Sequence, residues 1–264
     1  LARIIMDVIP KAMHKARHEA GEGENIADHR SSSPPLPFPK TKGKTKVVSP
    51  DPSVMEANRL VTHDTDQAIL DAYNMLRTHI LQMTRPHGWN SLMITSVRPG
   101  EGKTTTAINL GISLARDAQQ TSLLVDCQLR DPKVSAYLGL ETDLGLTDHL
   151  LDNVEMQNLL ISPGIDQFVV LPAGRKTVTS TDLLAAPKVQ TMVDGFRTRY
   201  SDRYVLFDCP HLLDIPDALV FSSYVDGIIL VVQADKTPRQ DIQTALDMLK
   251  EQNLIGLVLN NVQE

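Results

Sequence analysis

The segment SVRPGEGKTTT, residues 96–106, decides the fold of this chain. It follows the apolar run SLMITS, which has the pattern of a buried strand, and it opens a helical pattern expected from Gly102 to about Ala118. Gly100 and Gly102 allow backbone N–H groups to converge on an anion, and the helix N-terminus adds partial positive charge. Together these features predict a phosphate-binding P-loop.

The side chains of this loop have the chemistry that a nucleoside triphosphate requires. Lys103 can reach the β and γ phosphates, and the Thr104 hydroxyl can ligate Mg²⁺. Val97 replaces the first glycine of the strict pattern G-x-x-x-x-G-K-[ST], so the assignment depends on the flanking strand and helix. We expect ATP to be contacted by Pro99, Gly100, Glu101, Gly102, Lys103, Thr104, Thr105 and Asn260. Asn260 could offer its amide to the adenine edge, and the alternative is that it is a turn residue.

Two further apolar runs end in an aspartate. LLVD ends at Asp126, and YVLFD ends at Asp208. Because the carboxyl ends of parallel strands face the ligand crevice of an open α/β sheet, both carboxylates should converge on the phosphates. We expect Asp208 to hold Mg²⁺ through water, and Asp126 to ligate the metal or to accept a proton from an incoming hydroxyl. The predicted metal ligands are Thr104, Asp126 and Asp208, and the predicted cofactors are ATP and Mg²⁺.

Short apolar strands alternate with helical patterns over most of the chain. One helix is expected from about Asp66 to Thr84, where Pro86 and Gly88 end it. The predicted strands are SLMITS, SLLVD, QFVVLP, YVLFD, GIILVV and GLVLN. Most are unbroken apolar runs, which is typical of strands covered on both faces. The alternation predicts an α/β fold with a doubly wound, mainly parallel sheet that carries the P-loop.

Three segments are expected along the chain. Residues 1–20 have apolar residues at approximate helical spacing, which predicts a short amphipathic helix or an arm. Residues 21–53 are rich in proline, lysine and serine, and this composition predicts a disordered linker. The first two segments would form a flexible N-terminal extension. Residues 54–264 form the predicted P-loop ATPase or kinase domain.

Charge and hydropathy exclude several classes of function. The formal net charge is -6, whereas nucleic-acid binding needs a concentrated basic face, so no nucleic-acid partner is expected. Residues 1–50 hold nine Lys/Arg and five Asp/Glu, and this basic arm is either solvated or rests on an anionic surface. No apolar run approaches the ~18 to 20 residues of a membrane span, and no secretory leader is recognisable. A cytoplasmic protein is therefore expected.

In these motifs the chain resembles the bacterial tyrosine kinases (BY-kinases) of the CapB/CpsD type, within the MinD/ParA group of P-loop ATPases. The resemblance covers about Asp66 to Asn260, and RPGEGKTTT, LLVDCQLRDP, VLFDCPHLLDIPDA and GLVLN carry it. It implies an ATP-dependent protein tyrosine kinase that acts in capsule and exopolysaccharide biosynthesis and export. It implies as catalytic residues Lys103, Asp126, Asp208 and Arg130. Asp126 would activate the tyrosine hydroxyl.

The resemblance also implies partners. Such kinases work with a membrane-embedded chain-length regulator, or co-polymerase, which would bring this chain to the inner face of the plasma membrane. The segment DAYNMLRT, residues 71–78, looks like the family's oligomerisation helix with its pattern Glu-x-x-Arg-x-x-Arg. A homo-oligomer is therefore expected. It should be weak, because Asn74 replaces the middle arginine and lacks its charged fork of donors.

Some positions depart from the family pattern and keep two alternatives open. Gln128 stands at the second aspartate of the pattern Asp-x-Asp-x-Arg, His211 replaces a proline, and no tyrosine follows Tyr224, although such kinases autophosphorylate a C-terminal tyrosine cluster. Gln128 and the missing cluster favour a non-kinase ATPase switch of the same pathway. The other alternative is a MinD/ParA-type positioning ATPase, but Arg98 stands where those proteins have a signature lysine.

Overall fold

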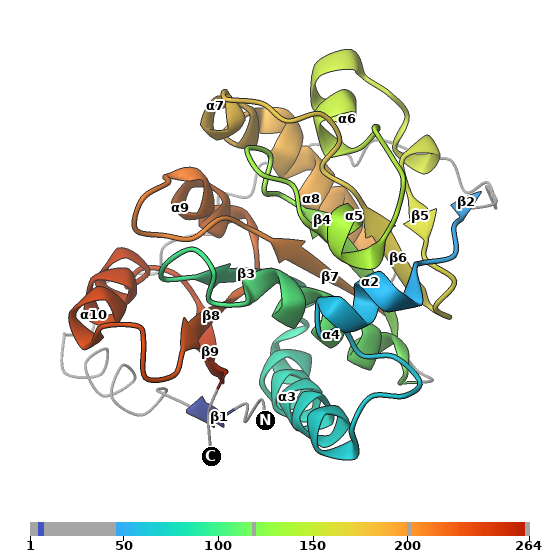
Figure 1. Cartoon of the computed structure of the whole chain (residues 1–264). Coiled ribbons are helices and arrows are strands. Elements are labelled where there is room, and N and C mark those ends of the chain that lie inside the picture. The colour runs from blue at the N-terminus through green and yellow to red at the C-terminus, as the bar shows by residue number, and fades with distance from the viewer. Residues whose placement is uncertain (1–4, 8–45, 118–119, 200–201, 262–264) are drawn as a thin grey trace.

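The computed structural model describes residues 5–7, 46–117, 120–199 and 202–261. Its strands form one sheet in the order β1-β9-β8-β3-β7-β4-β6-β5-β2 (Figure 1). The strands from β9 to β6 run parallel to one another, whereas β1 and β5 pair antiparallel with β9 and β6. The strand bounds are β1 Ile5–Asp7, β2 Lys46–Val47, β3 Ser91–Ser96, β4 Thr121–Asp126, β5 Ile161–Ser162, β6 Phe168–Leu171, β7 Arg203–Asp208, β8 Gly227–Gln233 and β9 Leu254–Asn260.

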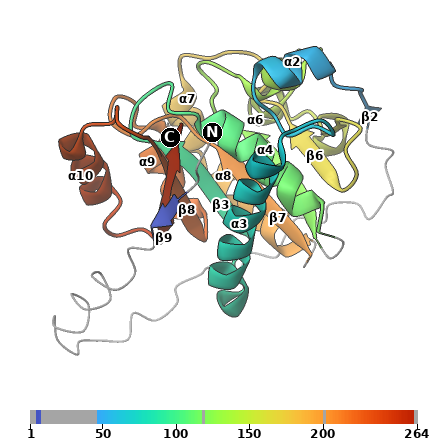
Figure 2. The ribbon, with the colours of Figure 1, turned by 60° about the horizontal axis from the view of Figure 1, so that its bottom comes forward.

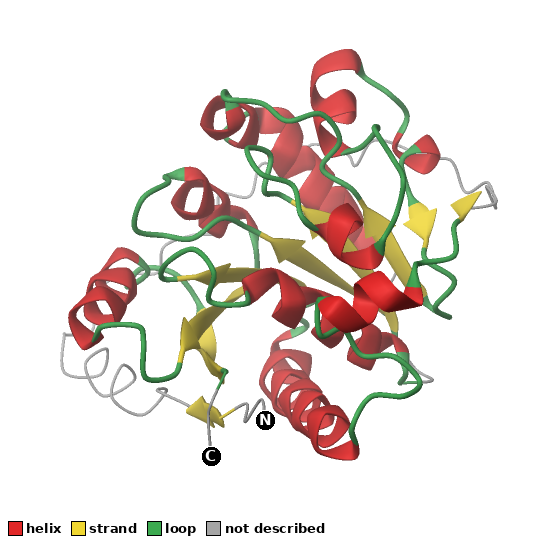
Figure 3. Ribbon diagram, viewed as in Figure 1, coloured by secondary structure: helices red, strands yellow, loops and turns green. Residues whose placement is uncertain are grey.

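Helices connect the strands and lie on both sides of the sheet (Figure 3). The helix bounds are α2 Pro52–Ala57, α3 Gln67–Thr84, α4 Lys103–Ala115, α5 Val134–Leu138, α6 Leu146–Asp152, α7 Ser180–Leu184, α8 Pro187–Arg199, α9 Asp217–Phe221 and α10 Arg239–Met248. Short 3₁₀ turns occupy Arg85–His87, Met156–Asn158 and Ser222–Tyr224. In the described part of the chain, no helix has the length and apolar character needed to cross a membrane.

Two apolar cores explain why the central strands are unbroken apolar runs. Leu92 and Ile94 of β3 pack into one core with residues of α2, α3, α4 and α5, whereas Met93, between them, packs into the other core with residues of α6 to α10. Successive side chains of a strand point to opposite faces, so a sheet covered on both faces needs apolar residues at every position. Figure 2 shows α3 and α4 on one side of the sheet and α8 on the other.

The sheet register places the predicted site at the carboxyl ends of the parallel strands. Strand β3 lies between β7 and β8, and β4 lies on the far side of β7. In the pairing of β4 with β7, Asp126 is the direct partner of Asp208. The P-loop follows β3 at the same edge, because β3 and β7 are parallel neighbours. The strand order thus gathers three segments from distant parts of the sequence.

Most expected elements are confirmed. Helix α3 begins after Asp66, whose carboxylate accepts a hydrogen bond from the Ala68 N–H at 2.7 Å, and it ends at Thr84, two residues before Pro86. Such an N-cap satisfies one of the free donors of the first turn. All six predicted strands are present. The doubly wound, mainly parallel sheet is therefore as predicted.

The N-terminal expectations differ from the structure where it describes them. Ile5–Asp7, expected in a short helix or an arm, is a strand that pairs with Leu257–Leu259 of β9. An edge strand offers unpaired N–H and C=O groups, and pairing with them outweighs a short helical pattern. Lys46–Val47 pairs with β5, and Asp51 caps α2 by accepting from Ser53 N at 2.9 Å, so ordered structure begins before residue 54. The other residues of 1–45 lie outside the described part.

Candidate nucleotide-binding site

The predicted P-loop connects β3 to α4 and has the backbone that its glycines allow. Gly100 and Gly102 have φ angles of 82° and 91°, values that only glycine adopts without strain. Gly102 also has no space for a side chain, because a Cβ there would lie 2.0 Å from the Asn260 Nδ2 atom. Lys103 begins the helix directly after it, and both Lys103 and Thr104 are buried. The loop therefore presents the start of α4 to the crevice.

Side chains from the loop itself, from the turn after β8 and from the end of β9 hold this loop in shape. The buried Glu101 carboxylate accepts a hydrogen bond from Arg98 N at 3.0 Å and another from the Thr237 hydroxyl at 2.5 Å. The Asn260 amide donates to the Glu101 carbonyl at 2.9 Å. The sequence left Asn260 either at the adenine edge or as a turn residue; in the structure it lines the pocket and its amide nitrogen braces the loop. Glu101 likewise acts through its side chain on the loop itself.

A buried amide connects the loop to one of the two aspartates. Gln128 Nε2 donates to Thr104 Oγ1 at 2.8 Å and to Asp208 Oδ2 at 2.6 Å. The other carboxylate oxygen, Asp208 Oδ1, is buried and has no hydrogen-bond partner among the described residues. Burial raises the pKa of Asp208, and the positive charge of Lys103 partly opposes this effect. Asp208 is therefore a buried carboxylate with one oxygen held by Gln128 and the other without a described donor.

Asp126 is held by backbone groups. Its Oδ1 accepts from Gln128 N at 2.9 Å, and its Oδ2 accepts from Lys133 N at 3.1 Å and Val134 N at 3.0 Å. Burial, followed by the nearby charge of Asp208, raises the pKa of Asp126 to about 7. A carboxylate with a pKa near neutrality can both accept and release a proton under physiological conditions. These contacts fix its orientation at the start of α5.

The P-loop borders a pocket of about 660 Å³, within the range of roughly 300–1,000 Å³ typical of small-molecule sites. Predicted ATP-contact residues line it: Gly100, Glu101, Gly102, Lys103, Thr104, Thr105 and Asn260. The lining also includes residues that sequence reasoning missed: Ala57, Asn58, Arg59, Ile69, Tyr73, Lys133, Tyr137, Gln233 and Asn261. Pro99, Arg130, Asp126 and Asp208 are not part of this lining, and the last two lie buried at the strand ends.

Comparison with known proteins identifies the family. Residues 92–264 match the CobQ/CobB/MinD/ParA nucleotide binding domain. Tyrosine-protein kinase CpsD of Streptococcus agalactiae is 30% identical over 195 residues, which are 73% of this chain and 83% of that protein. Tyrosine-protein kinase YwqD of Bacillus subtilis is 30% identical over 210 residues, 79% of this chain and 87% of that protein. The chain belongs to the bacterial tyrosine kinase family.

A solved structure agrees with this BY-kinase assignment. The VpsO kinase domain has 28% sequence identity and a TM-score of 0.66, over 72% of this chain and 93% of that chain. The family match over residues 92–264 includes the P-loop, both aspartate-bearing strands and the last strand. It confirms the predicted MinD/ParA-like fold and its nucleotide-binding class.

The oxygen atoms of this BY-kinase site fit a magnesium ion. Thr104 Oγ1 and Asp208 Oδ2 both lie within hydrogen-bonding distance of the Gln128 amide nitrogen, so a single small cation that displaced this amide could contact both. Asp208 Oδ1 adds an unpaired buried acceptor. Mg²⁺ prefers oxygen ligands and is usually bound by one or two carboxylates together with substrate phosphates. Asp126 is less available as a ligand, because both of its oxygens already accept backbone hydrogen bonds.

Arg130 is turned toward α7 and α9. Its Nε donates to Ser180 Oγ at 2.7 Å, its Nη2 donates to Thr181 Oγ1 at 3.1 Å, and its Nε lies 3.6 Å from Asp217 Oδ2. Asp217 is fully buried, whereas Arg130 is half-exposed. Contact between Arg130 and the phosphates, as the sequence suggested, would require the arginine to leave these partners.

The residues that sequence reasoning missed come from segments without a motif. Asn58 and Arg59 follow α2, and an Arg59 guanidinium nitrogen donates to Asn261 Oδ1 at 3.4 Å across the pocket. Thr237, between β8 and α10, supplies a hydroxyl to Glu101. These contacts join residues more than a hundred positions apart, and no local pattern could have indicated them.

Proposed function

We propose that this chain is an ATP-dependent protein tyrosine kinase of the BY-kinase type, acting in capsule or exopolysaccharide biosynthesis and export. The observation that carries the proposal is that Lys103 and Thr104 line one pocket, that Gln128 connects Thr104 to Asp208, and that Asp126 pairs with Asp208 in the sheet. Its relatives CpsD and YwqD are named tyrosine-protein kinases, which supports the same assignment. The proposed cofactors are ATP and Mg²⁺.

Each residue has a distinct role in this proposal. Backbone N–H groups of the loop and the Lys103 ammonium hold the β and γ phosphates. Thr104 and Asp208 would hold Mg²⁺, which when bound neutralises charge on the phosphates. Asp126 accepts the proton of the attacking tyrosine hydroxyl, a role for which a pKa of about 7 is suitable. Arg130 would stabilise transferred charge only after releasing Ser180 and Thr181.

A second candidate function is an ATPase switch that transfers little phosphate to protein. Gln128 favours it, because an amide stands between the two oxygens that would hold the cation. In such a switch, nucleotide occupancy would change oligomeric state or partner binding. Both functions use the same pocket, so phosphotyrosine measured against released phosphate distinguishes them.

The proposed partner is a membrane-embedded chain-length regulator, which would recruit a cytoplasmic chain to the inner face of the plasma membrane. A homo-oligomer through α3 is also proposed, but a weak one. Arg77 Nη1 donates to the Ser113 carbonyl at 2.7 Å, and Asn74 Oδ1 accepts from Ser113 Oγ at 3.3 Å. Both side chains contact α4 of the same chain, which limits what they can offer to a neighbouring copy.

Nucleotide binding is tested by thermal unfolding with and without ATP and Mg²⁺. A ligand at a hundredfold excess over its Kd should stabilise the fold by about 2.7 kcal/mol, since it binds only the native state. This corresponds to a rise in Tm of roughly 5–10 °C for a protein of this size. Lys103→Ala should remove most of the rise, and the exposed Lys250→Ala should retain it. An unchanged Tm in the parent protein would contradict the P-loop assignment.

Phosphotransfer is tested with labelled ATP, in the presence and absence of the cytoplasmic tail of the chain-length regulator. Label on tyrosine of either protein supports the kinase, whereas released phosphate without labelled tyrosine supports the switch. Lys103→Ala should abolish both signals. If neither signal appeared although ATP raised the Tm, both enzymatic proposals would be wrong and only nucleotide binding would remain.

A further inference from the structure

Gln128 occupies an unusual position for a neutral side chain. It is buried, and both hydrogens of its amide are used, one on Thr104 Oγ1 and one on Asp208 Oδ2. Its backbone N–H is fixed at 2.9 Å from Asp126 Oδ1. An amide nitrogen is a donor, so the acceptors it contacts are hydroxyl and carboxylate oxygens, the groups that a hard cation would otherwise contact. The side chain is thus held in the position that a cation would take.

The chemistry of this contact has two consequences for a cation. First, the amide supplies Asp208 with a donor, so the carboxylate does not depend on a metal for its only polar contact. Second, a metal that contacts Thr104 and Asp208 directly must displace two hydrogen bonds, one of them to a charged group. An aspartate at this position would do the opposite. It would add a carboxylate beside Asp126 and Asp208 and could not donate to either oxygen.

We propose that Gln128 is a built-in substitute for the cation, which makes nucleotide binding by this chain nearly independent of Mg²⁺. The inference rests on the proposed nucleotide-binding function and specifies how that site treats its metal. ADP or ATP binds through the loop N–H groups and Lys103 with the amide still in place. Mg²⁺ adds little to the affinity, because its gain is offset by the displaced amide.

The test is a titration of the full chain with a fluorescent ADP analogue, once with Mg²⁺ and once with excess EDTA. The parent protein should give the same Kd in both buffers within about threefold. Gln128→Asp should bind at least about tenfold more weakly in EDTA than with Mg²⁺, because its added carboxylate beside Asp126 and Asp208 then has no cation to neutralise it. Gln128→Asn keeps the neutral amide but is one methylene too short to bridge both oxygens. Its dependence of Kd on Mg²⁺ should lie between those of the parent protein and Gln128→Asp. Mn²⁺ binding without nucleotide, measured by electron paramagnetic resonance, should be weakest in the parent protein.

The outcomes separate this inference from the proposed function. Binding by the parent protein that is strongly dependent on Mg²⁺ would overturn the inference alone, and this measurement needs no variant to fold. The inference would also be overturned if Gln128→Asn had the same ratio of Kd in EDTA to Kd with Mg²⁺ as the parent protein. The lack of charge at residue 128, and not the hydrogen bonds to Thr104 and Asp208, would then set the dependence on Mg²⁺. Lys103→Ala should lose affinity in both buffers. A parent protein that binds nucleotide in neither buffer would overturn the proposed function, and this inference with it.

Discussion

At the scale of single residues, the two loop glycines have different constraints. Gly100 and Gly102 both have positive φ, but only a Cβ at Gly102 would collide with a neighbour, Asn260 Nδ2 at 2.0 Å. Gly100→Ala should therefore cost about 1 kcal/mol for backbone strain alone, and Gly102→Ala a further 1–3 kcal/mol or so for overpacking. Unfolding in denaturant without nucleotide measures both. Adding Asn260→Ala should restore part of the loss at Gly102 and none at Gly100. Equal costs for the two glycines would contradict this account.

The pH dependence of stability should report the aspartate pair. The folded chain raises the pKa of Asp126 from 3.8 to about 7, so the unfolded chain loses its proton first as pH rises. The contribution of this group is therefore complete below about pH 4 and is lost as pH rises toward about 7. Asp126→Asn removes the titration. Without nucleotide, this variant should have a Tm that is lowered by a pH-independent amount, because its backbone contacts change. The Tm difference, variant minus parent, should then rise with pH over that interval.

Calorimetry from about pH 4 to pH 8 measures this difference. The control is Asp194→Asn, which changes an exposed carboxylate and should give a difference that does not follow the same curve. A flat difference for Asp126→Asn would mean that Asp126 is ionised in the folded chain throughout the interval.

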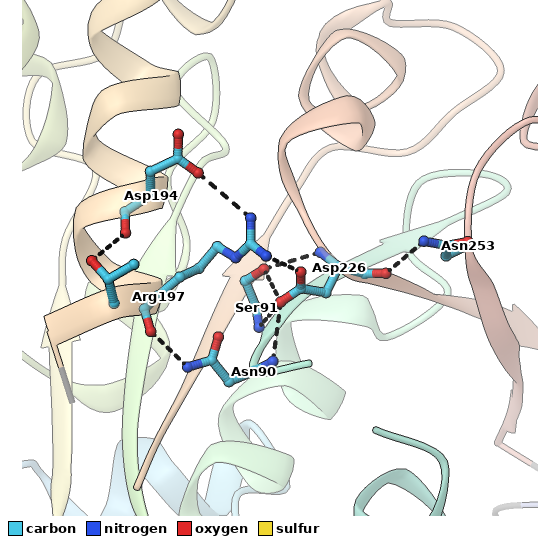
Figure 4. A network of polar contacts seen from close by, with 7 residues as sticks. Asn90, Ser91, Asp194, Arg197, Asp226 and Asn253 are labelled. Atoms are coloured by element: carbon cyan, nitrogen blue, oxygen red, sulfur yellow. Dashed lines mark hydrogen bonds and ion pairs between the residues drawn. The ribbon is translucent and has the colours of Figure 1, made fainter. Parts of the chain in front are cut away.

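At the scale of elements, one buried carboxylate joins α8 to the sheet (Figure 4). Asp226 Oδ2 accepts from Asn90 N at 3.0 Å, Ser91 N at 3.0 Å and Ser91 Oγ at 2.8 Å, and its Oδ1 pairs with Arg197 of α8. Its carbonyl accepts from the Asn253 amide at 3.1 Å. This network lies at the amino ends of β3 and β8, at the opposite edge from the nucleotide site. It holds together the elements that position the site without taking part in it.

Asp226→Ala should destabilise the fold by about 3 kcal/mol, because it leaves buried donors and Arg197 without their acceptor. Asp194→Ala is the matched control, since Asp194 pairs with the same arginine at 3.5 Å but is more than half exposed. It should cost less than about 1 kcal/mol. Both variants should bind nucleotide with unchanged Kd when folded. Similar losses in the two variants would show that the buried hydrogen bonds contribute little.

At the scale of the whole molecule, the structure moves the start of the folded domain. A chain that begins at residue 46 retains β2, Asp51 and all of α2, whereas one that begins at residue 54 lacks β2, Asp51 and the first two residues of α2. Loss of the cap alone should cost about 1 kcal/mol, which corresponds to roughly 2–4 °C in Tm. We expect the shorter chain to melt several degrees lower and the longer one to keep its nucleotide affinity. Identical Tm values would restore the boundary expected from the sequence.

The sequence by itself determined the elements and their chemistry. A strand followed by the loop at 96–106 and a helix, with two more apolar strands ending in Asp126 and Asp208, was sufficient for the fold and its class of ligand. These signals are local, because periodicity, glycine conformation and helix capping depend on neighbouring residues. The order of the strands brought the two aspartates together as expected.

Only the tertiary structure decided which side chains meet at the site. Gln128 bridges Thr104 and Asp208, Asn260 braces a carbonyl 159 positions away, and Ile5–Asp7 pairs with β9 against its helical pattern. Each contact depends on sheet register and on packing between elements, which no short pattern encodes. The sequence alone shows that Gln128 replaces the second aspartate of the family pattern Asp-x-Asp-x-Arg. That it fills the cation position follows from the fold, since parallel strands end at one edge and direct these side chains to one point.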